Sequence, residues 1–136
     1  MKLLLIYCTK FGYVPSVKTI ATDDDPAKPG DFENIQAAFM QVEEDDQENE
    51  KAVEKKLLKN LKWICGKNQT REIILHSFAH LSESKADPDF TNLFFNKVEE
   101  RMKNVGYTVH QTPFGYFLDL RIEAPGFSLA RVFKNI

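Results

Sequence analysis

Apolar positions along this chain recur with two periods, and each period predicts a different kind of element. Short apolar or alternating runs are typical of strands, whereas apolar residues three or four positions apart are typical of helices. The runs predict strands at residues 2–8, 34–43 (with a bulge near Phe39), 71–76, 107–111 and 116–123, and a short element at the end. Helical spacing predicts one helix through Val53, Leu57, Leu61 and Ile64, and a second through Phe90, Phe94, Val98, Met102 and Val105.

Both helices carry signals at their ends. Asp87 followed by Pro88 has the form of an N-cap with proline at the first helical position. Gly66 and Gly106 are expected to end the first and the second helix.

Residues 11–30 break both periods. They contain Gly12, Pro15 and Pro26 as well as the acidic residues at 23–25. This composition predicts a long loop, and loops of that length in compact domains are often functional.

The predicted order is strand, loop, strand, helix, strand, helix, strand, strand and a short final element. An alternation of this kind places helices against a mixed sheet. The short turn at residues 112–115 predicts that the strands on either side of it form an antiparallel hairpin. We therefore expect an α/β fold, a single domain over residues 1–136 with two amphipathic helices packed on a mixed sheet.

Charge narrows the class of partner. The 136 residues carry 18 Lys and Arg against 20 Asp and Glu, a formal net charge of -2. Because affinity for nucleic acid comes mainly from neutralising phosphates, this balance argues against a broad basic face, and we expect no DNA partner. A small local contact with RNA is compatible with it. Six acidic residues among the eight at 43–50 predict a solvated helix start.

Cysteine and histidine usage predicts neither a disulfide nor a metal site. Cys8 and Cys65 are too few and too far apart for a framework, so we expect reduced, partly buried thiols in a cytoplasmic protein. His76 and His80 lie four residues apart, but His76 ends a strand and no further ligand is visible, so no metal or other cofactor is predicted. His110 is expected on a strand surface. No apolar stretch approaches the roughly eighteen residues of a membrane span, so no membrane partner is expected.

Two segments hold side chains that packing alone does not require. Residues 78–82 place His80 just after a strand, where α/β proteins commonly hold ligands. Residues 112–117 gather Phe114, Tyr116 and Phe117 around a turn. The plainer alternatives are a half-buried His80 that caps a loop, and a hairpin core made of the three aromatic side chains.

These segments carry a resemblance to a known family. Ser77-Phe-Ala-His-Leu-Ser82, followed by Gly106-Tyr-Thr-Val109 and Thr112-Pro-Phe-Gly-Tyr116, resembles the N-terminal editing domain of archaeal threonyl-tRNA synthetases. The similarity extends to residues 2–7 and 38–43 and so covers nearly the whole chain. That family is similar in fold to the D-aminoacyl-tRNA deacylases, forms homodimers, and hydrolyses serine from mischarged tRNA specific for threonine.

The resemblance implies a pocket for the 3′-terminal adenosine and the seryl group. It assigns His80 to orienting the substrate or the attacking water, and the backbone of Phe78 and Ala79 to the aminoacyl group. The walls of the adenosine pocket are assigned to Phe114, Gly115, Tyr116 and Phe117. Aromatic walls suit a nucleobase, since stacking contributes about 1 to 3 kcal/mol per base.

Two positions depart from the family pattern. Leu118 stands where the family has a lysine that helps to position or activate the water, and Arg131 stands where it has a glutamate. A leucine cannot donate a hydrogen bond, and an arginine inverts the charge. Three outcomes stay open. Cleavage persists with help from backbone groups and the substrate's own ribose hydroxyl, or Arg121 or Arg131 supplies the missing cation, or the domain binds without catalysing.

We therefore expect a deacylase that hydrolyses the ester of a mischarged tRNA, seryl-tRNA specific for threonine, through contact with the acceptor end. The alternatives are a catalytically degenerate module that binds aminoacyl-tRNA or a synthetase, and an unrelated α/β domain that shares the motifs by chance. No aminoacylation domain follows within the 136 residues, so we expect action in trans or docking on threonyl-tRNA synthetase, as a homodimer in the cytoplasm.

Overall fold

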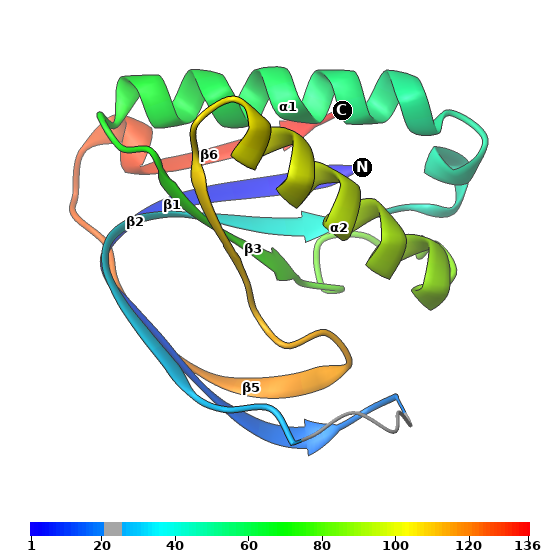
Figure 1. The fold of residues 1–136 in the computed structure, drawn as a ribbon, viewed down its shortest axis with the longest axis horizontal. Coiled ribbons are helices and arrows are strands. Elements are labelled where there is room, and N and C mark those ends of the chain that lie inside the picture. The colour runs from blue at the N-terminus through cyan, green and yellow to red at the C-terminus, as the bar shows by residue number, and fades with distance from the viewer. Residues whose placement is uncertain (21–25) are drawn as a thin grey trace.

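Six strands form one mixed sheet in the order β4-β3-β2-β1-β5, with β6 also paired to β1 (Figure 1). The computed structural model describes residues 1–20 and 26–136, so the acidic residues at 23–25 lie outside the described part. The strands are β1 (Lys2–Lys18), β2 (Gly30–Gln41), β3 (Glu72–Ser77), β4 (Thr108–Gln111), β5 (Tyr116–Glu123) and β6 (Arg131–Asn135). The expected α/β class with a mixed sheet and two main helices is confirmed.

β1 is long enough to pair with two different strands along the same edge. Residues 2–6 pair with β6 and residues 10–18 pair with β5, both antiparallel, while β2 runs along the other side of β1. The hairpin of β1 and β2 curves, so that the half carrying β5 lies below the half covered by the helices (Figure 1).

The prediction of a loop over residues 11–30 is wrong for residues 11–18 and at Gly30. Phe11 and Tyr13 are buried, 1% and 8% exposed, and their burial holds this stretch in the sheet in spite of Gly12 and Pro15. A proline in a strand removes a backbone donor, and the register with β5 shifts between Pro15 and Lys18. The bulge expected near Phe39 does not occur, because β2 keeps one register against both β1 and β3.

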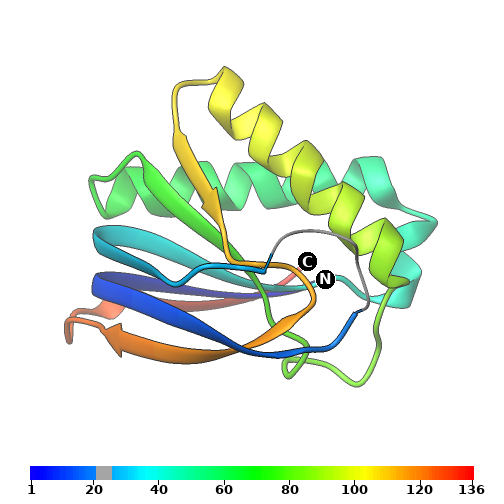
Figure 2. The same ribbon diagram turned by 60° about the horizontal axis from the view of Figure 1, so that its bottom comes forward.

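The predicted hairpin between the strands on either side of residues 112–115 is also wrong. β4 pairs in parallel with β3, whereas β5 pairs with β1 at another edge of the sheet. Figure 2 shows the chain crossing from the end of β4 to the start of β5. Thr112 still donates from its backbone to the Leu75 carbonyl, and the Gly115 carbonyl accepts from the Thr19 backbone, so the crossing is tied to the sheet at both ends.

Two helices cover one face of the sheet (Figures 1 and 2). They are α1 (Glu50–Lys67) and α2 (Pro88–Asn104), and the short 3₁₀ turns are η1 (Glu44–Gln47) and η2 (Ser128–Ala130). The predicted apolar stripes pack into the main core, except that Val105 lies past the end of α2 and is 53% exposed. Asp87 caps α2 as expected, since its carboxylate accepts from the backbone of Asp89 and Phe90.

A second, smaller core lies around the curve of the sheet. It contains Phe11, Tyr13, Phe39, Ile35, Ala37, Ile74 and Cys8. Cys8 and Cys65 are both unbridged and fully buried, so they are more buried than expected. Burial raises the pKa of the Cys8 thiol to about 11 and that of Cys65 to about 12, so both thiols are protonated at neutral pH. Within the described residues, no helix is long and apolar enough to cross a membrane.

The buried position of Phe11 tests whether residues 11–18 form a strand. We expect Phe11→Ala to lower the free energy of unfolding by about 3 to 5 kcal/mol, because a large aromatic side chain leaves the second core. Val17→Ala is the matched control from the same strand, since Val17 is 58% exposed and its truncation should change stability by no more than about 0.5 kcal/mol. Urea unfolding of both variants checks this. Equal effects of the two substitutions would contradict it.

Candidate functional site

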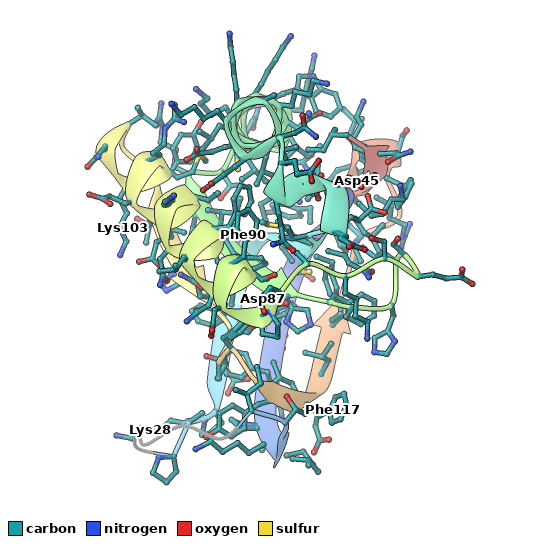
Figure 3. All side chains as sticks on the ribbon, turned by 90° about the vertical axis from the view of Figure 1, so that its right-hand side faces the viewer. Lys28, Asp45, Asp87, Phe90, Lys103 and Phe117 are labelled. Atoms are coloured by element: carbon teal, nitrogen blue, oxygen red, sulfur yellow. The ribbon has the colours of Figure 1, made fainter. Side chains whose placement is uncertain are left out.

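A pocket of about 450 Å³ lies at the carboxyl ends of β2 and β3, between the start of α2 and the start of β5. Figure 3 views this side of the molecule, with Asp87 before α2 above and Phe117 at the start of β5 below. Both segments singled out in the sequence line it. Its lining includes Phe78, Ala79 and His80 from one segment, and Phe114, Gly115, Tyr116 and Phe117 from the other, with Leu118 directly after it.

Gln41, the last residue of β2, holds the loop that follows β3. Its side chain is buried, and its Oε1 accepts from the backbone N–H groups of Leu81 and Ser82, each at 2.7 Å. Its Nε2 donates to the carbonyls of Ser82 at 2.8 Å and Ser84 at 3.0 Å. An amide side chain has two N–H donors and one acceptor oxygen. Gln41 therefore bonds both to N–H groups and to carbonyls of the loop. The loop is therefore built into the wall of the pocket.

Glu43 adds a charged contact to the same loop. Its Oε2 accepts from the Ser82 hydroxyl at 2.7 Å, and its Oε1 lies 2.8 Å from the amino group of Met1. Burial by itself would raise the pKa of Glu43, but the hydrogen bonds from the Met1 amino group and from Ser82 outweigh it and lower the pKa to about 2. Glu43 is therefore ionised at neutral pH and is occupied by these contacts.

His76 lies at the floor of the pocket, where the sequence had suggested only the end of a strand. Its Nδ1 is 2.8 Å from the Thr112 hydroxyl, and its ring meets Phe39 edge-on with centroids 5.0 Å apart. It is 6% exposed, and burial lowers its pKa to about 4, so the imidazole is neutral at pH 7. The one signal in the sequence was a polar ring at the end of an apolar strand.

His80 and the aromatic residues form the more open part of the pocket. His80 is exposed rather than half-buried, and its ring meets Phe78 with centroids 5.0 Å apart. The alternative of a hairpin core does not hold for the aromatic segment, because β4 and β5 do not pair and Phe117 is 59% exposed. These rings therefore leave surface for a planar ligand.

The backbone beside these rings is only partly available. The Phe78 N–H already donates to the Met40 carbonyl at 3.0 Å. A bound group would therefore meet the Phe78 carbonyl and the backbone of Ala79. At Gly115, φ is +84°, and a Cβ would stand 3.2 Å from Ile20, so glycine suits the turn that closes this wall.

Arg121 and Arg131 are not among the described residues that line the pocket. Arg121 pairs with Asp31 at 2.6 Å, across Gly12 of the strand between them, where a Cβ would stand 2.6 Å from the Asp31 carboxylate. Arg131 begins β6 and pairs with Ile6. The geometry therefore gives no support to either arginine as the cation of the pocket.

Lys85 is a lining residue that sequence reasoning missed. It lies on the same loop as His80, and its side chain is exposed. No described lining residue is an Asp or a Glu, and the described part of the chain holds no group of three or more His, Cys, Asp or Glu that could bind a metal. The pocket thus combines aromatic walls, two imidazoles and one lysine.

The fold is the first feature that the comparisons show. It is a D-aminoacyl-tRNA deacylase-like α/β fold, and the solved structure of the c-Myc DNA Unwinding Element Binding Protein matches 100% of this chain and 99% of its own with a TM-score of 0.74. Identity to that structure is 11%, so the similarity describes the fold alone.

The sequence then shows the family. Residues 1–136 match the family described as the archaea-specific editing domain of threonyl-tRNA synthetase, and the chain belongs to it. The Threonine--tRNA ligases of Thermococcus sibiricus and Thermococcus kodakarensis are each 30% identical over 139 residues, and that of Methanopyrus kandleri is 28% identical over 137 residues. Each match covers 100% of this chain and 22% of the relative, so the chain spans about a fifth of the length of these proteins.

Loss of the Gln41 hydrogen bonds should destabilise the loop after β3 more than the rest of the domain. We expect Gln41→Leu, which keeps the volume but not the hydrogen bonds, to lower stability by about 1 to 3 kcal/mol, since loop groups lose their partner. Amide hydrogen exchange should speed up at Leu81 and Ser82 and stay near wild type at Leu61 inside α1. The same acceleration at all three amides would contradict a local role.

The buried imidazole predicts a dependence of stability on pH. Because the pKa of His76 is about 4 when folded and near 6.5 when exposed, the unfolded chain takes up the proton first as the pH falls. Stability contributed by neutral His76 is therefore complete above about pH 6.5 and is lost as the pH falls through 4, on the order of 3 kcal/mol. Urea unfolding at several pH values should show this slope for the wild type and for His80→Gln, but not for His76→Gln. An unchanged slope in His76→Gln would refute the assignment.

Proposed function

We propose that this domain is an aminoacyl-tRNA deacylase that hydrolyses the ester of a mischarged tRNA, with seryl-tRNA specific for threonine as its substrate. The observation that carries the proposal is that both motif segments line one and the same pocket, in a chain of the editing-domain family. Its volume of about 450 Å³ lies in the range of pockets that hold small ligands, as a nucleoside with a small aminoacyl group requires.

The terminal adenosine fits the aromatic wall. Phe114, Tyr116 and Phe117 line the pocket on the side of β5, and Phe117 is 59% exposed, so its ring offers a face for stacking. Gly115 lets the backbone approach the ligand in the same wall. An acidic domain can bind RNA in this way, because a shaped pocket for one nucleoside needs little neutralisation of phosphates.

The ester fits the opposite side. Hydrolysis requires a water molecule to add to the ester carbonyl and the ribose oxygen to leave with a proton. We assign His80 to orienting the water or the substrate, and the Phe78 carbonyl and Ala79 backbone to the aminoacyl group. Neutral His76 lies below them as a polar group at the floor. No described lining residue offers a carboxylate, so the proton transfers fall to imidazole, water or the substrate's own ribose hydroxyl.

Membership of the family supports a proposal about the wider setting. We propose that the domain works in the cytoplasm as a homodimer, on the acceptor end of tRNA, alone or together with threonyl-tRNA synthetase. The buried, unbridged thiols of Cys8 and Cys65 are consistent with a reducing compartment.

Leu118 favours a second candidate function. It lines the pocket as an apolar side chain, and no arginine among the described lining residues replaces a cation there. A module that binds aminoacyl-tRNA without hydrolysing it is compatible with such a site.

Deacylation tests the first function directly. The purified domain should release serine from seryl-tRNA specific for threonine, while the cognate threonyl ester is cleaved more slowly by about 10-fold or more, since one methyl group contributes about 1 to 3 kcal/mol to discrimination. His80→Ala should reduce the rate by about 100-fold or more. Release no faster than with heat-treated protein, from seryl-, threonyl- and D-aminoacyl-tRNA alike, would exclude the catalytic function.

Leu118→Lys separates the two functions in the same assay. A fall from substantial activity indicates a rearranged site that works without a lysine there, whereas a rise from no activity indicates a degenerate binding module. Arg131→Glu is the matched control, because Arg131 is not among the described lining residues and its substitution should leave the rate unchanged.

A further inference from the structure

Lys85 is the one lysine or arginine among the described residues that line the pocket. Its backbone is held from both sides. The preceding residue, Ser84, accepts from Gln41 through its carbonyl and from the Glu44 backbone through its hydroxyl, each at 3.0 Å. The following residue, Ala86, is buried and donates from its backbone to the Val42 carbonyl at 3.0 Å. The side chain of Lys85 thus starts from a fixed point and ends at the open rim.

The neighbouring charges leave Lys85 available. It forms no ion pair within the described part of the chain. Of the nearby carboxylates, Glu43 is held by the Met1 amino group and Ser82, and Asp87 caps α2. Glu83 is exposed on the loop.

The other obvious anion site at this rim is already occupied. Pro88 and Thr91 of α2 line the pocket, so the start of this helix lies beside it. Helix N-termini attract anions through their unpaired N–H groups. Here the Asp89 and Phe90 amides donate to the Asp87 carboxylate, at 3.0 and 3.3 Å. The start of this helix is therefore already occupied by a carboxylate of the same chain. A ligand phosphate at the rim would therefore find its positive charge at Lys85.

We propose that Lys85 binds the phosphodiester that joins the last two nucleotides of the tRNA acceptor end. The inference rests on the proposed function, in which the terminal adenosine enters the pocket. A lysine lies at the exposed rim of the pocket and a neutral imidazole at its buried floor. This arrangement orients the ligand, with its phosphate at the rim and its ester inside. Lysine is a compact point charge that commonly binds phosphate.

The cation then comes from a different element of the fold than Leu118. Leu118 comes from β5, whereas Lys85 comes from the loop after β3. A rim lysine acts in binding and orientation, so its loss should raise KM and leave kcat largely intact. Lys85 is thus a binding residue for RNA.

The test compares two ligands that differ by the phosphodiester. NMR titrations would measure the dissociation constants of adenosine and of the dinucleotide cytidylyl-(3′→5′)-adenosine for the wild type and for Lys85→Gln. We expect Lys85→Gln to weaken dinucleotide binding by about 10-fold, as for loss of one charge-assisted hydrogen bond, and to leave adenosine binding unchanged. Lys85→Arg should retain most of the affinity. Lys51→Gln, an exposed lysine of α1 outside the lining, is the matched control and should bind both ligands like the wild type.

Each other outcome overturns the proposal in a distinguishable way. If Lys85→Gln binds the dinucleotide as tightly as the wild type, Lys85 does not contact the phosphate, and the proposed function stands. If it weakens adenosine and the dinucleotide equally, the substitution has disturbed the loop rather than removed a phosphate contact. If the wild type binds neither ligand in the pocket, the proposed function fails together with the inference.

Discussion

The pocket depends on one buried amide. Gln41 ends β2 at the point where the chain after β3 must turn away from the sheet, and its side chain bonds to Leu81, Ser82 and Ser84 of that loop. A buried amide that lost these partners would be left unsatisfied at a considerable cost in free energy. The loop therefore has one favourable conformation, and that conformation brings His80 and Lys85 to the same pocket.

The aromatic wall of the pocket, at residues 114–117, depends on the curvature of the long β1 and β2 hairpin. Because β1 pairs with β6 along its first part and with β5 along its second, the sheet gains an edge strand far from β4. Residues 112–115 must cross to reach β5 (Figure 2), and Phe114 and Gly115 on this crossing line the pocket together with the last residues of β2 and β3. Parallel strand ends commonly leave such a crevice for ligands.

Local signals in the sequence predicted most of the helices and strands. They did not predict which strands pair with one another. The cap at Asp87 and the strand Tyr116–Glu123 depend on neighbouring residues and are confirmed. The strand at residues 11–18 depends on burying Phe11 against Phe39, which lies on another strand, so Gly12 and Pro15 were misleading. The hairpin prediction failed because a short connection permits a hairpin without requiring one.

For the site as well, local sequence signals predicted some residues, and those that depend on non-local contacts were missed. The motif segments predicted that residues 78–80 and 114–117 would matter, and both stretches line the pocket. Arg121 instead pairs with Asp31 across Gly12, a contact that depends on the register of β5 against β1 and not on neighbouring residues. Gln41 and Lys85 carried no such signal, because their contacts depend on how the loop after β3 folds, whereas His76 carried only that of a polar ring at the end of an apolar strand.

The proposed function requires this pocket to receive the aminoacylated 3′ end of tRNA. The most direct measurement is a crystal structure of the protein with a non-hydrolysable seryl-adenosine analogue, in which an amide replaces the ester. We expect the adenine ring to lie against the wall of Phe114 to Phe117 and the seryl group to lie beside Phe78, Ala79 and His80. An empty pocket at a saturating concentration of the analogue, or the analogue bound elsewhere, would contradict it.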